Sequence, residues 1–130
     1  MIYYNYYDRH STTIVLLIDY GGDCLISSDV IRGYNDIIIL YLLLDKDSYG
    51  YEISKQIRTL SNEKYIIKET TLYSAFTRLE KNNYIQSYFG AETNGKRRTY
   101  YRITQEGREC YEEKCQEWFL VKEVVEKFVK

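Results

Sequence analysis

The sequence predicts an α+β fold that is mostly helical: a winged helix-turn-helix of three helices and a β-hairpin wing, followed by a long C-terminal helix. Three observations predict it. Apolar residues recur at three- and four-residue steps in three segments between residues 28 and 81, the period of a helix with one buried face. Two alternating segments then flank Asn94 and Gly95, the strongest short hairpin signal. A last helical period runs to the C-terminus.

The first helix is predicted over residues 28–44. Ser28 and Asp29 supply an N-cap and a first-turn acid. The segment "IIILYLLL" is apolar nearly all round, so it must be covered on several sides. The apolar positions that recur with the helical period are Ile31, Tyr34, Ile37, Ile38, Tyr41 and Leu42.

The second helix is predicted over "YGYEISKQIRTL", with Ser48 as its N-cap. Its apolar face consists of Tyr49, Ile53, Ile57 and Leu60.

The third helix is predicted to begin near Glu69, whose carboxylate suits a first turn, and to end at Asn82 and Asn83. Its core stripe at positions i, i+3, i+4 and i+7 is Leu72, Ala75, Phe76 and Leu79.

Two strands follow. In "YIQSYFG", residues 85, 87 and 89 alternate with residues 86 and 88, and in "RRTYYRIT", residues 99, 101 and 103 alternate with residues 98, 100 and 102. Thr104 is predicted to cap the last helix.

The outer face of the third helix is polar and predicts contact with DNA. Small hydroxyl side chains let a helix enter the major groove, and longer donors at its margin reach phosphates. An ordinary solvated face is the alternative for this helix taken alone. The predicted DNA contacts on it are Thr70, Thr71, Tyr73, Ser74, Thr77, Arg78 and Lys81.

The wing adds three adjacent cations, Lys96, Arg97 and Arg98. The chain has a formal net charge of −1, yet seven cations and only three anions lie between Lys68 and Arg102. A basic segment of this kind suits a DNA-facing surface. Strand alternation places Arg97 on one side and Arg98 on the other, so Lys96 and Arg97 at the tip are the strongest candidates. The alternative is that these cations only protect an exposed hairpin edge.

Other classes of protein are disfavoured. The cysteines are odd in number, Cys24, Cys110 and Cys115, without CxxC spacing, which predicts neither a disulfide scaffold nor a metal site and suits a reducing cytoplasm. The longest apolar run is too short for a bilayer. No paired-carboxylate, phosphate-loop or nucleophile motif is present, so we expect no enzyme and no cofactor.

The first two dozen residues show no helical period. Residues 21–23, Gly-Gly-Asp, can be encoded by a sequence that reads as a bacterial ribosome-binding site, and Leu25 by a TTG start codon. The hypothesis is that native translation starts at Leu25, which the intact mass of the native protein would test; a genuine, loosely ordered arm is the alternative. The predicted organisation is therefore a leader over 1–26, a winged helix-turn-helix domain over 27–104 and a dimerisation helix over 105–130.

The segments "GYNDIIILYLLLDKDSYGYEISKQI", "TTLYSAFTRLEKNNYI" and "GKRRTYYRITQEGRE" resemble the PadR family of bacterial repressors. The resemblance covers residues 27–130. It implies a homodimer on an inverted-repeat operator, with Thr71, Tyr73 and Ser74 at the DNA and Lys96 and Arg97 on the wing. In one departure, residues 68–70 read Lys-Glu-Thr where the family usually has Ser-Pro-Gly, which removes a good N-cap and the proline at the first helical position.

The last helix is predicted to pair with a second copy. Trp118, Val121, Val125 and Phe128 step by three and four residues, a seam that suits a partner helix, although packing on the chain's own first helix is the alternative. The predicted dimer interface is Ile38, Tyr41, Val121, Val125 and Phe128. Trp118, the single tryptophan, is either structural or stacks on a ligand; the resemblance implies sensing of a planar aromatic or drug-like effector.

Two functions therefore remain open from the sequence. The first is a dimeric, ligand-responsive DNA-binding repressor. The second is a winged-helix module that has lost DNA binding and acts through protein contacts.

Overall fold

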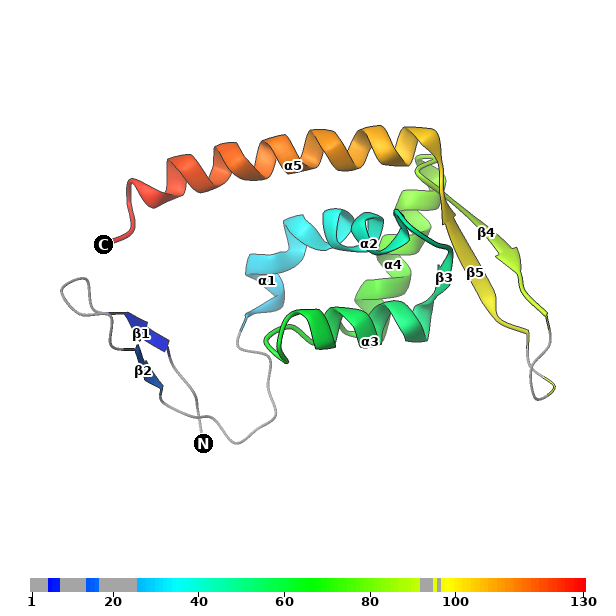
Figure 1. Cartoon of the computed structure of the whole chain (residues 1–130), viewed down its shortest axis with the longest axis horizontal. Helices are drawn as coiled ribbons and strands as arrows, with labels where there is room; N and C mark the ends of the chain where they lie inside the picture. The colour runs from blue at the N-terminus through cyan, green and yellow to red at the C-terminus, as the bar shows by residue number, and fades with distance from the viewer. Residues whose placement is uncertain (1–4, 8–13, 17–25, 92–94, 96) are drawn as a thin grey trace.

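The computed structural model describes residues 5–7, 14–16, 26–91, 95 and 97–130, and it confirms the winged helix-turn-helix prediction (Figure 1). A separate antiparallel pair, β1 and β2, precedes the main fold. In chain order the elements are β1 (Asn5–Tyr7), β2 (Ile14–Leu16), α1 (Ser28–Ile31), a 3-10 turn η1 (Arg32–Tyr34), α2 (Asn35–Leu43), β3 (Ser48–Tyr49), α3 (Gly50–Leu60), α4 (Glu69–Lys81), β4 (Ile85–Phe89), β5 (Thr99–Ile103) and α5 (Gln105–Glu126).

The predicted first helix is divided into α1, η1 and α2. Its cap is Ser27 rather than Ser28, because the side chain of Ser27 accepts a hydrogen bond from the Val30 amide at 3.3 Å. Asp29 lies in the first turn as predicted.

The most buried face of α2 differs from the predicted one. Ile39, Leu40 and Leu43 are at most 1% exposed, whereas Tyr41 is 54% exposed. A helix that is apolar nearly all round carries little directional information, so the period alone could not choose the inward face. The predicted positions instead flank the core and line grooves beside it.

The start of α3 also differs from its prediction. Ser48 does not cap the helix; it belongs to the short strand β3 and pairs with Tyr101 of β5, while Tyr49 occupies the cap position without a side-chain hydrogen bond. Ile53 and Ile57 are buried as expected, but Leu60 is 64% exposed.

The main core lies where α2, α3, α4 and the sheet meet. The predicted stripe of α4 is buried throughout, with no member more than 2% exposed. Phe76 of α4 stacks on Tyr101 of β5, with ring centroids 4.0 Å apart. This stack joins the third helix directly to the wing.

The wing is an antiparallel hairpin within a three-stranded sheet of order β3-β5-β4. Its register pairs Ile85 with Ile103 and Phe89 with Thr99. Gly95 has φ +75°, a conformation that glycine adopts without strain, as its predicted place in the turn requires. Asn94 and Lys96 lie outside the described residues.

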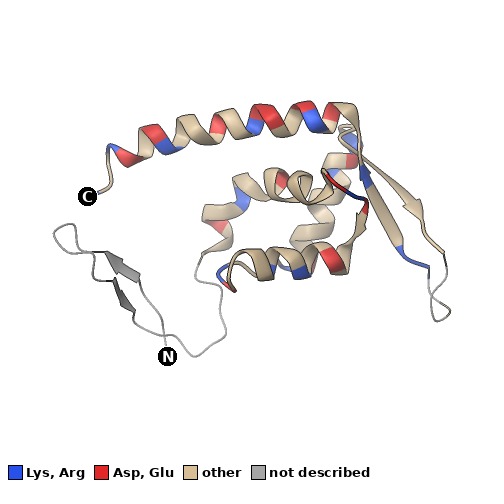
Figure 2. Cartoon of the chain, viewed as in Figure 1, with Lys and Arg blue, Asp and Glu red and all other residues tan. Residues whose placement is uncertain are grey.

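The long helix α5 begins at the base of the wing and runs along α1 and α2 (Figure 1). Thr104 caps it as predicted: its Oγ1 accepts a hydrogen bond from the Gly107 amide at 2.9 Å. Along this helix seven acidic residues are interspersed with three basic ones, as the colours of Figure 2 show. None of the helices in the described ranges is both long and apolar enough to cross a bilayer.

Candidate nucleic-acid interface

The exposed ridge of α4 consists of short polar side chains. Residues on a helix turn by about 100° each, so the buried stripe leaves the opposite side to Thr70, Ser74, Thr77 and Lys81, which are all exposed. The Thr77 hydroxyl donates to the Tyr73 carbonyl at 3.0 Å, so it offers only its acceptor lone pairs outward. No other described residue engages the hydroxyls of Thr70 and Ser74 in a hydrogen bond, so the ridge presents these two hydroxyls and one ammonium group.

The start of α4 follows from the departure at residues 68–70. Lys68 occupies the cap position and makes no side-chain cap hydrogen bond, and Glu69 is the first-turn acid. At the other end, Asn83 has φ 62° and ends the helix as predicted. The hydroxyls of Thr70 and Ser74 are therefore not consumed in capping.

Tyr73 lies on the side of α4 that faces the wing. Its ring contacts Phe76 edge-on, with centroids 5.5 Å apart, and its side chain is held beside Gly50 at the start of α3. The residue is 46% exposed. Tyr73 thus combines a fixed position with an accessible surface.

The cations of the wing divide between its two faces. Phe89 shares the face of Ile85 and Ser87, the face directed at α4, since Ser87 Oγ donates to the Glu80 carboxylate of α4. The guanidinium of Arg97 lies over the Phe89 ring, 5.7 Å from its centroid, and both residues are exposed. Arg97 and the ridge of α4 are therefore on the same side of the molecule.

The opposite face of the wing holds Arg98 away from α4. The guanidinium of Arg98 lies 4.5 Å from the centroid of the Tyr49 ring. Further along that face, Tyr88 donates to Asp47 at 2.6 Å, which raises the pKa of the Tyr88 phenol. The structure thus does not bring Arg98 together with the other predicted DNA contacts.

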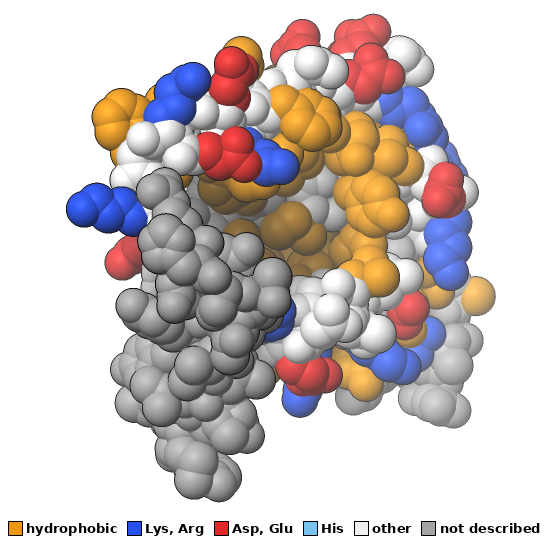
Figure 3. Space-filling model, turned by 60° about the vertical axis from the view of Figure 1, so that its left-hand side comes forward, with side chains coloured by type: hydrophobic (Ala, Val, Ile, Leu, Met, Phe, Trp, Pro, Cys, Tyr) orange, Lys and Arg blue, Asp and Glu red, His pale blue; other side chains and the backbone are white. Residues whose placement is uncertain are grey.

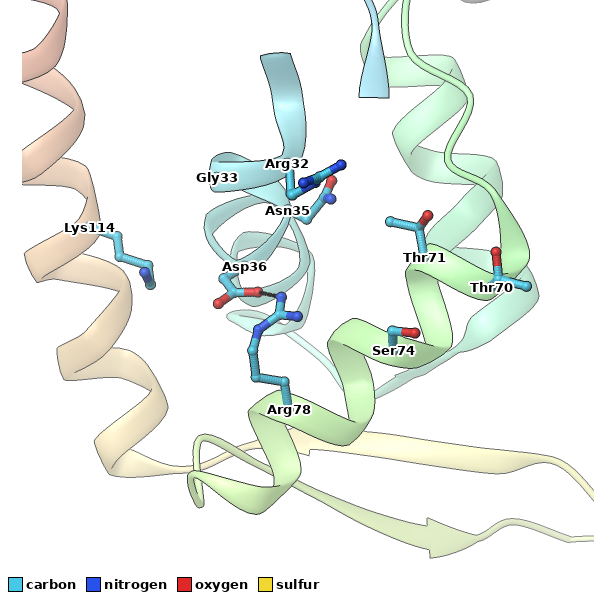
Figure 4. Close-up of a pocket in the computed structure, with 9 residues that line it drawn as sticks. All are labelled: Arg32, Gly33, Asn35, Asp36, Thr70, Thr71, Ser74, Arg78 and Lys114. Atoms are coloured by element: carbon cyan, nitrogen blue, oxygen red, sulfur yellow. Dashed lines mark hydrogen bonds and ion pairs between the residues drawn. The ribbon is translucent and has the colours of Figure 1, made fainter. Parts of the chain in front are cut away.

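The other flank of α4 borders a polar crevice. Arg78 forms an ion pair with Asp36 of α2, and Thr71 is half-buried on the same side. Arg78 and Thr71 therefore lie beside the ridge rather than on it. Figure 4 shows this crevice, about 510 Å³ in volume, with Arg32 and Lys114 on its other walls.

Three residues of this surface were missed by sequence reasoning: Phe89, Arg32 and Lys114. The strand alternation placed Phe89 on the same face as Ile85, and that signal could have identified it. Arg32 and Lys114 lie on η1 and α5, far apart in the sequence, and no periodicity links them.

A second candidate site is the apolar groove between α1, α2 and α5. It has a volume of about 940 Å³ and is lined by Tyr34, Trp118, Val121 and Val125, among others. Figure 3 shows it as a hollow lined with hydrophobic side chains. The ring of Trp118 contacts Tyr34 edge-on at 5.3 Å and remains 40% exposed.

The predicted dimer residues lie along α2 and α5. Ile38 and Val121 are half-buried, whereas Tyr41, Val125 and Phe128 are 54%, 50% and 82% exposed. Val121 and Val125 line the apolar groove together with Trp118.

The two cysteines of α5 are free thiols. Burial raises the pKa of Cys110, which keeps its thiol protonated and unreactive, and a side-chain hydrogen bond with Cys115 raises the pKa of Tyr111 to about 12. Within the described ranges no three His, Cys, Asp or Glu side chains converge as metal ligands.

Comparison with known proteins identifies the family. The model of the transcriptional regulator PadR-like family matches residues 39–113, which include the ridge of α4 and the wing. This chain belongs to the PadR family.

Two solved transcriptional regulators share this fold, and a further relative is similar in sequence. A transcriptional regulator of Clostridium thermocellum is 68% identical, with a TM-score of 0.75 over 81% of this chain and 99% of that one. A PadR-family regulator of Clostridium difficile is 43% identical, with a TM-score of 0.65 over 75% of this chain and 100% of that one. An uncharacterized protein of Lysinibacillus sphaericus is 48% identical over 105 residues, 81% of this chain and 96% of its own. The protein is thus a PadR-family transcriptional regulator.

Proposed function

We propose that this PadR-family regulator is a homodimeric repressor that binds an inverted-repeat operator. The ridge of α4 enters the major groove, and Lys96 and Arg97 of the wing contact the adjacent backbone. One observation carries this proposal: Arg97, held over Phe89, projects on the same side as the ridge of α4. The stack of Phe76 on Tyr101 keeps the two parts in a fixed relation, so both can meet one duplex.

The dimer is supported by the apolar surface of α5. Phe119, Leu120 and Val124 are each more than half exposed, as are Phe128 and Val129, and a monomer rarely leaves such a surface open. A second copy is the partner proposed for it.

A planar aromatic effector is proposed for the groove at Trp118. The volume of about 940 Å³ is that of a site for a drug-sized molecule. Trp118 remains 40% exposed, so its indole offers an aromatic surface on which such a molecule can stack. Occupancy of a groove formed by α1, α2 and α5 would change how the two copies are held, and through them the spacing of the two α4 helices.

The wing contact is tested by replacing both Lys96 and Arg97 with Ala. The DNA is a duplex selected from a random-sequence pool by the full chain, and affinity is measured by fluorescence anisotropy over a range of salt concentrations. Each lost phosphate contact should lower the slope of log affinity against log salt by about 0.9. Binding should weaken on every sequence, whereas Ser74→Ala should alter sequence preference.

The matched control removes two cations from the opposite end of the molecule, with Lys127→Ala and Lys130→Ala combined. This variant has the same net charge as the wing variant. Equal salt slopes for the two variants would contradict the wing assignment, and absence of salt-sensitive DNA binding by the natural chain would favour the protein-interaction alternative.

A further inference from the structure

The crevice beside α4 combines cations from three separate elements. Arg32 comes from η1, Arg78 from α4 and Lys114 from α5, and the ridge residues Thr70 and Ser74 form part of the same wall (Figure 4). The crevice therefore opens next to the surface proposed to enter the major groove.

The charge of the crevice is positive. Asp36 is the one carboxylate among the described residues that line it. Its side chain is only 18% exposed and is paired with Arg78, whose side chain stays 49% exposed, so the pair presents its guanidinium outward. Among the ion pairs of the described residues none includes Lys114. Glu117, one turn further along α5, lines the neighbouring hollow rather than the crevice.

Arg32 is also available to an anion. It pairs with Asp29 at 2.7 Å, but the two side chains are 76% and 83% exposed. An ion pair this accessible contributes little, so exchanging Asp29 for a phosphate costs little. Arg32 and Lys114 can therefore bind an anion in the crevice without breaking a buried interaction.

A helix in the major groove lies between two phosphate backbones. On the wing side of α4, Arg97 faces one of them. On the other side, the crevice occupies the position that the second backbone must cross, because Thr71 and Arg78 mark the flank of α4 opposite Tyr73 and Glu80.

We infer that Lys114 and Arg32 bind phosphates of the DNA strand on the side of α4 opposite the wing. The inference rests on the proposed function and extends it: the helix that serves dimerisation also contributes a DNA contact. Lys114 thereby fixes the orientation of α5 relative to the duplex.

The test compares single variants in the salt titration described above. Lys114→Gln and Arg32→Gln should each lower the salt slope by about 0.9 per protomer, with little change in sequence preference, since phosphate contacts carry no sequence information. Lys114→Arg retains the charge and should keep the natural slope. Gel filtration checks that every variant keeps the natural oligomeric state.

Lys122→Gln is the matched control, because it removes one cation from the same helix at a position that lines the apolar groove. A Lys114→Gln slope equal to that of Lys122→Gln, with the wing variant still reduced, would overturn the crevice contact and leave the proposed function standing. A natural chain that does not bind DNA would overturn both.

Discussion

Gly50 is required at the start of α3 because of a side chain on the neighbouring helix. A Cβ atom at this position would lie 2.6 Å from Tyr73 Oη and 3.1 Å from Tyr73 Cζ, closer than such atoms approach. The absence of a side chain at Gly50 therefore lets the Tyr73 phenol lie against α3. Among the predicted DNA contacts, Tyr73 is thus positioned by a residue that does not itself face the ridge.

Replacing Gly50 with Ala should displace the Tyr73 ring and weaken DNA binding. The clashing atoms belong to a side-chain end rather than to backbone, so the ring should move while α3 keeps its place, and Ala favours the helix. We expect DNA affinity to fall about tenfold, equivalent to about 1.4 kcal/mol, with the thermal midpoint nearly unchanged. Fluorescence anisotropy and thermal melting measure the two quantities.

Tyr73→Phe provides the control, because it removes the atom nearest to the added Cβ. In a double-mutant cycle, Gly50→Ala should cost less in a chain that already carries Tyr73→Phe than in the natural chain. An equal cost in both backgrounds would show that Gly50 acts on DNA binding by another route.

At the level of elements, the sequence predicted correctly where capping residues and hydrophobic spacing indicate the same helix. Thr104 caps α5, and the stripe of α4 is buried as its spacing indicated. The prediction that Ser48 caps α3 was wrong, because a serine before a helical period resembles an N-cap even when the residue belongs to a strand. Its pairing with Tyr101 is a contact between distant parts of the chain, which local patterns do not encode.

Thr104 fastens α5 to the end of α4 through its hydroxyl. Besides capping α5, Oγ1 donates to the Asn83 carbonyl at 2.6 Å. Thr104→Ala should lower the free energy of unfolding by about 1 kcal/mol, whereas Thr104→Ser keeps both hydrogen bonds and should lose much less. Urea unfolding followed by circular dichroism measures the difference; equal losses would mean that the methyl group, rather than the hydroxyl, stabilises this corner.

At the level of the whole molecule, the proposed interface is only partly visible in the sequence. Hydroxyls on a helix and cations after a turn are local patterns, and they led to the prediction of Ser74 and Arg97 as DNA contacts. Arg97 and Arg98 lie on opposite faces of the wing, and the pairing of the strands with the rest of the fold decides which of the two faces α4. The crevice depends on how α5 lies across η1, and packing of this kind has no local signature at Arg32 or Lys114.

The effector groove and the crevice meet at one turn of α5. Lys114 lines both the crevice and a hollow of about 290 Å³ that also touches Tyr34 and Trp118. A ligand seated on Trp118 that shifts this turn would move Lys114 relative to α4. Effector and DNA should therefore influence each other's binding through α5.

Linkage makes this expectation quantitative. If an aromatic ligand weakens DNA binding by some factor, DNA must weaken ligand binding by the same factor. An anionic naphthalene sulfonate is a suitable probe, because its charge keeps it off DNA. Its binding is followed through Trp118 fluorescence with and without the selected duplex, and DNA binding by anisotropy with and without the probe.

In the natural chain, the factor by which the probe weakens DNA binding should equal the factor by which DNA weakens probe binding. In Lys114→Gln both factors should move towards one, because this variant lacks the ammonium group through which the movement of α5 would reach the DNA. Lys127→Gln, which removes a cation that does not line the groove, should keep the natural factor. If the probe binds equally well with and without DNA, the groove at Trp118 is independent of operator binding, and the tryptophan serves only to pack α5 against Tyr34.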